Sequence, residues 1–288
     1  MISIVGATGH TGRALVSLLE NRQVPQRLLV RDTAAAGHLL GTHHDLRRID
    51  TADPAGITAT LDGSHALFLL MGNSPEQFIW ERNIVQAAVR ARVPRIVKVS
   101  GFSPAPESPG GVDRVHAAVE EYITASGLAY CFLRPSLAMY DIALLHGPGI
   151  RRHSVLSTAL TGPVAFLDSR DLAAAAATAL TQDGHEYTRY RITGPQAFTP
   201  AETAALLTTA TGRRIIAARC SEEEEQHALQ ACGLPTFLTD HIQALFREIN
   251  TGTVGEATSD YEKLTGLTPR TLHSYLAEHH TDFQPTST

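Results

Sequence analysis

The 288-residue chain is poor in lysine, in cysteine and in long apolar runs, and these shortages exclude several classes of protein. Lys98 and Lys263 are its two lysines, and the formal net charge of −5 gives no support for nucleic-acid binding. The three cysteines stand far apart without a Cys-x-x-Cys pair, which argues against a disulfide framework and a zinc site. An apolar run such as Ala66 to Met71 is far too short to span a membrane.

The rest of the composition is typical of a globular protein, with 43% hydrophobic and 18% charged residues. The first residues run directly into an apolar segment, so we expect no signal peptide and a cytoplasmic protein. The unpaired cysteines agree with a reducing compartment. We expect a small-molecule substrate, no nucleic-acid or membrane partner, and a monomer or homodimer.

A glycine-rich stretch near the N-terminus is the motif around which the expected fold is arranged. Residues 6–12, of sequence GATGHTG, follow the β-branched run Ile2 to Val5 and precede a helical pattern. A buried strand, a glycine turn and a helix in this order form a dinucleotide-binding unit, in which the first amides of the helix face the anion. Gly6 allows the sharp turn, Gly9 leaves room for a pyrophosphate, and Gly12 lets the helix pack closely on the strand. An ordinary tight turn is the alternative.

The residues after the second expected strand, Arg27 to Val30, indicate which nucleotide is bound. NAD-binding units usually carry an acidic residue here for the ribose 2′-hydroxyl, whereas an arginine favours a 2′-phosphate. Arg31 comes first and Asp32 second, and a guanidinium forms bidentate pairs with phosphate. We therefore expect NADP(H) rather than NAD(H), with a solvated Arg31–Asp32 pair as the alternative.

Strands and helices alternate through the first half of the chain, which predicts an α/β fold built on a doubly wound Rossmann parallel sheet. A smaller, mostly helical C-terminal substrate lobe is expected to complete it. The expected strands of the sheet are 2–5, 27–30, 47–49, 66–70, 95–99 and 130–133, and the expected helices are 11–21, 54–61, 75–91 and 112–125.

The pattern changes after Pro135, which sets the expected domain division. The NAD(P)-binding domain is predicted over 1–135 with 161–195, and the substrate lobe over 136–160 with 196–280, followed by a flexible tail over 281–288. Later elements are expected as a lid segment at 138–150, strands at 164–167, 189–193 and 213–217, and helices at 169–180, after Thr199, after Ser221 and through 239–279.

Ligands of such sheets bind beyond the carboxyl ends of the strands. Small and polar residues follow several of these strands, in addition to the glycine loop. Asp50, after the third strand, either meets the adenine or its ribose or caps the next turn. The predicted cofactor-binding residues are Gly6, Thr8, Gly9, His10, Thr11, Gly12, Arg31, Asp50, Met71, Gly72, Ser100, Gly101, His116 and Pro135.

Many short motifs together resemble the NmrA-like group of atypical short-chain dehydrogenase/reductases, closest to its branch of triphenylmethane reductase and type 2 quinone oxidoreductase. The resemblance covers nearly the whole chain. It implies a Rossmann core, NADPH, and reduction of electron-poor small molecules such as quinones, although some members bind NADP only to sense it. Besides the glycine loop and Arg31, the motifs are VSGFS at 99–103, HAAVE at 116–120, SGLAY at 126–130, LRP at 133–135, RDLA at 170–173, GHE at 184–186, ITGP at 192–195, SDYEKLTG at 259–266 and PRTL at 269–272.

The Tyr-x-x-x-Lys pair that serves many short-chain dehydrogenases as proton donor is missing, because no tyrosine here has a lysine four residues later. Val112 stands in place of the tyrosine and His116 in place of the lysine. His116, oriented by Glu120 one turn further on, is a candidate to bind the nicotinamide ribose or to supply a proton, and a purely structural pair is the alternative. Ser100 ends a central strand and is a candidate contact for nicotinamide or substrate.

His116, Ser100 and Tyr140 are the predicted catalytic residues. A quinone or a cationic conjugated acceptor needs no tyrosine, since hydride moves directly and any proton can come from solvent. The protein then positions the acceptor and excludes water. Residues expected to form a flat wall for the acceptor, or else plain core, are Phe102, Met139, Tyr140 and Phe237.

These features predict an NADPH-dependent reductase that transfers hydride to a quinone-like or conjugated small molecule. Two alternatives stay open: an NADP-binding redox-sensing regulator without turnover, and a non-redox cyclase or isomerase that retains the NADP site. No metal site is expected, because the histidines have no convincing ligand spacing and His43-His44-Asp45 is interpreted as a solvated loop.

Overall fold

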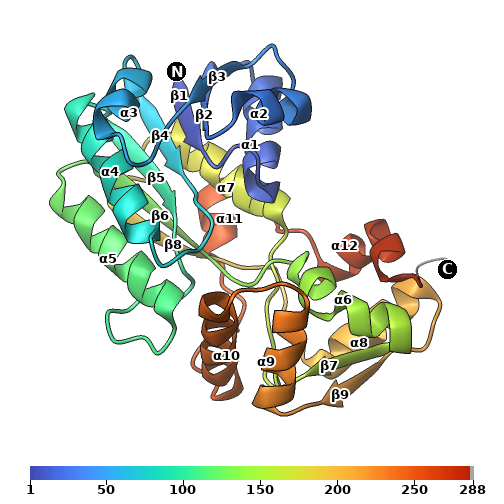
Figure 1. The fold of residues 1–288 in the computed structure, drawn as a ribbon. Helices are drawn as coiled ribbons and strands as arrows, with labels where there is room; N and C mark the ends of the chain where they lie inside the picture. The colour runs from blue at the N-terminus through green and yellow to red at the C-terminus, as the bar shows by residue number, and fades with distance from the viewer. Residues whose placement is uncertain (286–288) are drawn as a thin grey trace.

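The computed structural model describes residues 1–285 and has a seven-stranded parallel sheet at its centre, in the order β3-β2-β1-β4-β5-β6-β8 (Figure 1). The order reverses between β1 and β4, so a crevice opens at the carboxyl ends of these two neighbours. The predicted doubly wound sheet is confirmed. Its strands are β1 (Ile2–Val5), β2 (Gln26–Val30), β3 (Asp45–Arg48), β4 (Ala66–Leu69), β5 (Arg95–Val99), β6 (Ala129–Pro135) and β8 (Thr188–Ile192).

Helices cover both faces of the sheet, because successive residues of a buried strand point to opposite sides and each side must be covered. In β1, Ile4 packs in the core under one helical layer and Val5 in the core under the other. One layer holds α1 (His10–Asn21), α7 (Ser169–Thr181) and α11 (Asp260–Thr265); the opposite layer holds α3 (Pro54–Leu61), α4 (Gln77–Arg90) and α5 (Gly111–Ala125).

The second half of the chain builds a lobe beyond the carboxyl edge of the sheet (Figure 1). It has its own apolar core and a small parallel sheet of two strands. Helix α10 packs against both α9 and α5, which brings the lobe across the crevice. The elements of the lobe are α6 (Asp141–His153), β7 (Val155–Thr158), α8 (Pro200–Thr211), β9 (Ile216–Arg219), α9 (Glu222–Ala231), α10 (Thr236–Asn250) and α12 (Leu272–Glu278).

Several expected elements differ from the observed ones. Helix α2 (Thr33–Leu40) was not predicted, and neither was β7. The expected strand at 164–167 makes only single bridges, from Val164 to Phe198 and from Leu167 to Ala138, because neither partner residue belongs to a strand. The strand expected at 213–217 is β9, shifted toward the C-terminus, and the expected lid segment is mostly the packed helix α6.

The end of the chain is packed further than expected. The 3-10 helix η1 (His280–Phe283) contacts α6 and α8, and Phe283 is fully buried in the core of the lobe. The chain is thus anchored at Phe283 rather than frayed from residue 281, and residues 286–288 of the expected tail lie outside the described residues. In residues 1–285, no helix has the length and apolar character needed to cross a membrane.

The domain division stays a prediction, with one feature that modifies it. Helix α11 falls within the segment assigned to the substrate lobe, yet Tyr261 and Leu264 pack in the core beneath α1 and α7. The tyrosine is also tied to α7, since its hydroxyl donates a hydrogen bond to the Asp171 carboxylate at 3.4 Å. The chain therefore returns from the lobe to the sheet at α11 before it forms α12 and η1.

Candidate active site

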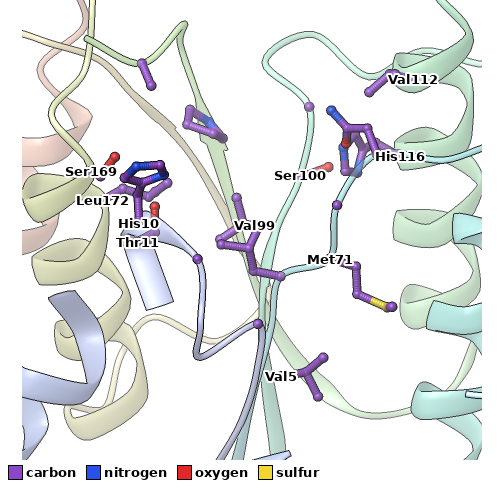
Figure 2. Close-up of a pocket in the computed structure, with 18 of the residues that line it drawn as sticks. Val5, His10, Thr11, Met71, Val99, Ser100, Val112, His116, Ser169 and Leu172 are labelled. Atoms are coloured by element: carbon purple, nitrogen blue, oxygen red, sulfur yellow. The ribbon is translucent and has the colours of Figure 1, made fainter. Parts of the chain in front are cut away.

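A cavity of about 1090 Å³ lies along the carboxyl ends of the strands, between the sheet and the lobe. Figure 2 shows His10, Thr11, Ser169 and Leu172 on one side of it, with Met71, Ser100 and His116 on the other. Its lining includes thirteen of the predicted site residues: Gly6, Thr8, Gly9, His10, Thr11, Arg31, Met71, Gly72, Ser100, Gly101, His116, Pro135 and Tyr140.

Two predicted cofactor residues, Gly12 and Asp50, do not line the cavity. Gly12 instead serves the packing of α1, as the glycine motif predicted. The Asp50 carboxylate accepts a hydrogen bond from the Ala52 amide at 2.9 Å, so it caps the turn before α3. Of the two interpretations of Asp50, the structure favours the turn cap.

The three positions of the loop are glycine for different structural reasons. Gly6 has a φ of +91°, and a Cβ built on it would lie 2.1 Å from the Leu70 carbonyl oxygen. A Cβ on Gly12 would lie 2.0 Å from the Gly6 carbonyl oxygen. A Cβ on Gly9 would meet only that same oxygen, at an ordinary 3.7 Å. Packing therefore requires Gly6 and Gly12, whereas the missing side chain of Gly9 leaves room in the cavity.

Helix α1 begins beside this space with its first amides uncapped. Its N-cap is Gly9, which has no side chain to accept a hydrogen bond, and no acidic residue stands in its first turn. The amides of His10, Thr11 and Gly12 belong to the donors that a helix leaves unsatisfied at its start. With the partial positive charge of the helix end, these amides are suited to bind an anion.

Arg31 lies at the rim of the cavity, directly after β2. Its neighbour Asp32 caps α2, and its carboxylate accepts hydrogen bonds from the amides of Ala34 and Ala35 at 2.9 and 3.0 Å. No Arg31–Asp32 ion pair forms among the residues that the structure describes. Because Asp32 is engaged in the cap, the Arg31 guanidinium is available for a ligand phosphate, which argues against the alternative of a solvated pair.

His116 is buried at the wall of the cavity and is held by a lysine rather than by Glu120. Lys98 Nζ lies 3.3 Å from His116 Nδ1 and also donates to Glu81 Oε1 at 3.0 Å. The expected partner Glu120 instead pairs with Arg134, accepting at 2.9 Å from Nε and at 2.5 Å from Nη2. The expectation that Glu120 orients His116 is therefore wrong, because the arginine on β6 takes up both carboxylate oxygens.

This arrangement determines the state of the imidazole. An ammonium has only donors, so Nδ1 must accept from Lys98 and the ring proton stays on Nε2. Burial lowers the pKa of His116 well below 6.5, and the positive charge of Lys98 lowers it further. His116 is therefore neutral at neutral pH, with Nε2–H as its hydrogen-bond donor.

Ser100 follows β5 at the same wall (Figure 2). Its amide donates to the Leu133 carbonyl oxygen at 2.8 Å, but its buried Oγ has no hydrogen-bond partner among residues 1–285. A buried hydroxyl without a partner is costly unless a ligand or water satisfies it. This orphaned atom, together with the space left by Gly9, fits a bound nicotinamide dinucleotide.

Two titratable residues at this wall were not predicted. Asp113, in the first turn of α5, is buried, and His241 comes from α10 of the lobe. Their closest atoms, Oδ2 and Nδ1, lie 3.8 Å apart. Burial, followed by repulsion from Glu248, raises the pKa of Asp113 to about 6, and burial lowers the pKa of His241 to about 4.

Replacing Asp113 with asparagine should stabilise the fold at high pH only. The pKa of Asp113 is raised from 3.8 to about 6, so its ionisation penalty is absent below about pH 4, grows between about pH 4 and 6, and is complete above. We expect a gain of about 3 kcal/mol at pH 8 and almost none at pH 4, measured by urea unfolding. Glu121→Gln, at an exposed position of the same helix, should change stability by less than about 0.5 kcal/mol. An equal gain for Asp113→Asn at both pH values would contradict the assignment.

Tyr140 closes the cavity between the glycine loop and the lobe. Its ring stacks on His10, with centroids 4.4 Å apart and planes at 18°. Burial raises the pKa of Tyr140 to about 12, with smaller contributions from Asp141 and Tyr275, so its hydroxyl stays protonated and is a weak acid. Of the other expected wall residues, Phe102 lines the cavity, while Met139 is in the core of the lobe and Phe237 lies outside the lining.

One group of side chains away from the cavity has metal-ligand chemistry. The ligand atoms of Glu20, His43 and His44 lie within 4.8 Å of one another. None of the three lines the cavity, and His43 Nε2 lies 2.8 Å from the Glu20 carboxylate, at hydrogen-bond distance. This group therefore lies apart from the cavity, and the expectation of no metal site stays a prediction.

The chain is similar to known NAD(P)H-dependent proteins over most of its length. The profile of a family described as NAD(P)H-binding matches residues 6–183. An NAD(P)H azoreductase of Xenophilus azovorans is 31% identical over 280 residues, 97% of this chain and 98% of that protein. The NADPH-dependent quinone oxidoreductase of Escherichia coli, solved with NADPH, has a TM-score of 0.86 at 30% identity, covering 98% and 99% of the two chains. Citrobacter triphenylmethane reductase has a TM-score of 0.86 at 26% identity, covering 97% and 99%.

Proposed function

The chain belongs to the NAD(P)H-binding, NmrA-like family of short-chain dehydrogenase/reductases, and from that premise we propose that it reduces a quinone-like or otherwise conjugated small molecule with NADPH. The predicted family and an NAD(P)H-dependent oxidoreductase activity are confirmed. The preference for NADPH and the class of acceptor are the proposal.

The continuity of the cavity supports this proposal best. One end carries the glycine loop and Arg31, which suit the phosphates of a dinucleotide. The other end is formed largely by apolar side chains from α5 and the lobe, which suits a flat apolar acceptor. These apolar residues are Val112, Leu137, Val164, Leu245, Ile249 and Val254.

The residues of the chain have separate roles in this reaction. When bound, the cofactor supplies a hydride from C4 of its nicotinamide ring. The first amides of α1 bind the pyrophosphate, and Arg31 binds the 2′-phosphate. Ser100 Oγ and His116 Nε2–H supply hydrogen bonds at the nicotinamide end, and the apolar wall positions the acceptor and excludes water. No Tyr-x-x-x-Lys pair takes part, and the relatives named as acting on azo compounds, quinones and triphenylmethane dyes set the chemical class of acceptors to test.

Replacing Arg31 with alanine should weaken NADPH binding by about 10- to 100-fold, the worth of hydrogen bonds to a charged phosphate. NADH, which has no 2′-phosphate, should lose less than about threefold. Equilibrium titration of both nucleotides measures the two effects. Arg48→Ala is the matched control, because Arg48 is an exposed arginine of the adjacent β3, paired in register with Val30, and does not line the cavity. An equal loss for both nucleotides would contradict the role of Arg31.

Oxidation of NADPH at 340 nm in the presence of a panel of quinones and azo compounds tests the reaction itself. Turnover that requires the protein and weakens with Arg31→Ala supports the reductase. Tight NADPH binding without consumption across the panel would favour a redox-sensing regulator or a non-redox enzyme. Failure to bind either nucleotide would overturn the proposal.

A further inference from the structure

We infer that Asp113 is the proton donor of this active site, the general acid that replaces the missing tyrosine. The inference rests on the proposed reductase function. Val112 stands where a tyrosine-dependent enzyme would carry its proton donor, and the inference assigns the acid to the next residue, Asp113. It also applies only to acceptors whose reduction consumes a proton.

The Asp113 carboxyl group lies between two glycines at the reactive end of the cavity. A Cβ on Gly101 would lie 2.4 Å from Asp113 Oδ1 and 3.2 Å from His116 Cδ2. A Cβ on Gly110 would lie 3.5 Å from Asp113 Oδ2 and 2.7 Å from His241 Nδ1. One carboxyl oxygen therefore lies beside Gly101, in the loop that carries Ser100, and the other lies toward His241.

The carboxyl group has no hydrogen-bond donor holding it as a carboxylate. Within residues 1–285 the carboxyl group makes no hydrogen bond. His241 Nδ1 lies 3.8 Å from Asp113 Oδ2, beyond hydrogen-bond distance, and that nitrogen is itself buried without a partner. The other two aspartates in the lining accept hydrogen bonds from backbone amides. Asp32 accepts from Ala34 and Ala35 at 2.9 and 3.0 Å, and Asp141 accepts from Ala138 at 3.0 Å. Asp113 is thus the carboxyl group at the cavity wall that is free to carry and release a proton.

Burial and the charged side chains around Asp113 favour the acid form and oppose the partial positive charge at the start of α5, which favours the carboxylate. His116 on the same helix is neutral, and its Cδ2 edge faces the Asp113 side, whereas Lys98 from β5 bonds the opposite Nδ1 edge and pairs with Glu81. Helix α10 contributes a neutral His241 and the negative Glu248, which repels the ionised form. Burial is the largest cause of the raised pKa of Asp113, about 6, which places the group near the pH at which a general acid works well.

The proton has a defined place in the reduction of an aromatic azo compound. Hydride forms an N–H bond at one nitrogen, the N=N π pair moves to the other nitrogen, and that nitrogen takes the proton of the Asp113 carboxyl. The acceptor gains two electrons and becomes a hydrazine, the nicotinamide is oxidised, and Asp113 becomes a carboxylate. Water returns the proton to Asp113 when the product leaves.

A triarylmethyl cation serves as the control acceptor for the azo compound. Hydride adds to its central carbon and gives a neutral product, so no proton is consumed. An acid at Asp113 should therefore matter for the azo compound and not for the cation. Loss of a residue that only supports the fold would affect both acceptors alike.

The experiment measures kcat/KM of wild-type protein, Asp113→Asn and Asp141→Asn with both acceptors and saturating NADPH. We expect Asp113→Asn to lower kcat/KM for the azo compound by about 100-fold, which is within the usual contribution of a general acid. For the cation, kcat/KM should fall by less than about threefold. Three outcomes would overturn the assignment. Asp113→Asn could lower kcat/KM equally for both acceptors, or lower it for neither. Alternatively, Asp141→Asn rather than Asp113→Asn could lower kcat/KM for the azo compound alone. NADPH titration of Asp113→Asn checks that the variant still folds and binds the cofactor.

The pH profile gives a second readout. Wild-type kcat/KM for the azo compound should fall above about pH 6, as Asp113 loses its proton, and Asp113→Asn should remove this limb. Glu248→Gln should move the limb to lower pH, because it removes the charge that repels the Asp113 carboxylate. An unchanged limb in Asp113→Asn overturns the inference. Wild-type protein that binds NADPH but reduces neither acceptor overturns the proposed function instead, so the two failures are distinguishable.

Discussion

Replacing Lys98 with methionine should lower the free energy of unfolding by about 3–5 kcal/mol, the cost of leaving one member of a buried ion pair alone. Lys98 is completely buried, and its ammonium donates to Glu81 at 3.0 Å, to the Val99 carbonyl oxygen at 2.6 Å and to His116 at 3.3 Å. Methionine is similar in length to lysine and fills the space, so the loss measures the missing charge rather than a cavity. Urea unfolding at pH 8 measures the effect.

The effect should depend on pH with a definite sign. Burial already raises the pKa of Glu81, and Lys98 opposes that rise, so removing the lysine raises it further. A carboxyl group whose pKa is higher in the folded state destabilises the fold increasingly as pH rises above its unfolded value. The penalty of Lys98→Met should therefore be small near pH 4 and large at pH 8.

A second-site variant separates charge from packing. Glu81→Gln in the Lys98→Met background removes the stranded carboxylate and keeps an amide that can bond with Gln77, the other partner of Glu81. We expect the double variant to recover more than half of the stability lost at pH 8. A double variant as unstable as Lys98→Met alone would show that packing, not the unpaired charge, causes the loss.

The same variant should also affect the active site. Without the lysine, His116 Nδ1 loses the donor that fixes its tautomer, and a positive charge that lowers the pKa of His116 disappears. We expect the imidazole pKa to rise and the two neutral tautomers to mix, which nitrogen chemical shifts report directly. We therefore expect Lys98 to act as a positioning residue, which affects ligand binding through His116.

Sequence patterns predicted the parallel sheet because its central strands β1, β4 and β5 are buried on both faces and read as short apolar runs between helices. Ends of strands and helices were less well predicted. Helix α2 was missed because Asp32 was considered only as a residue that selects the nucleotide. The Asp32 side chain in fact forms the N-cap of this helix of eight mostly small residues. The apolar run at 164–167 resembled a strand, but neighbouring strands, which a local pattern does not reveal, are needed to form a ladder.

The site was predictable where a local motif carries it. The glycine loop, Arg31 and Ser100 follow directly from strand ends, and the structure places them along one cavity. Asp113 and His241 were missed because they meet only through the packing of α10 on α5, helices more than 100 residues apart in sequence. A signal for Lys98 was present, since one of only two lysines stands between Val97 and Val99 inside β5.

Two alanine substitutions in the glycine loop should have opposite consequences. Gly12→Ala places a Cβ 2.0 Å from the Gly6 carbonyl oxygen and 2.8 Å from backbone atoms of Ala7, so α1 must move away from β1. Overpacking usually costs about 1–3 kcal/mol, and a clash with backbone on two sides falls at or above the upper end. We expect Gly12→Ala to lose at least about 3 kcal/mol in urea unfolding without any nucleotide.

Gly9→Ala should keep the stability of the wild-type protein and lose the cofactor. Its backbone has a φ of −76°, which alanine adopts without strain, and its Cβ would meet nothing closer than 3.7 Å. The added methyl group points into the space beside the uncapped amides of α1, where the pyrophosphate is proposed to bind. We expect NADPH affinity to fall by at least about 10-fold, since each 1.4 kcal/mol of lost contact is a factor of ten. If Gly9→Ala bound NADPH normally, the phosphates would have to lie elsewhere in the cavity, and the orientation assigned to the cofactor, with Arg31 at one end and Asp113 at the other, would be wrong.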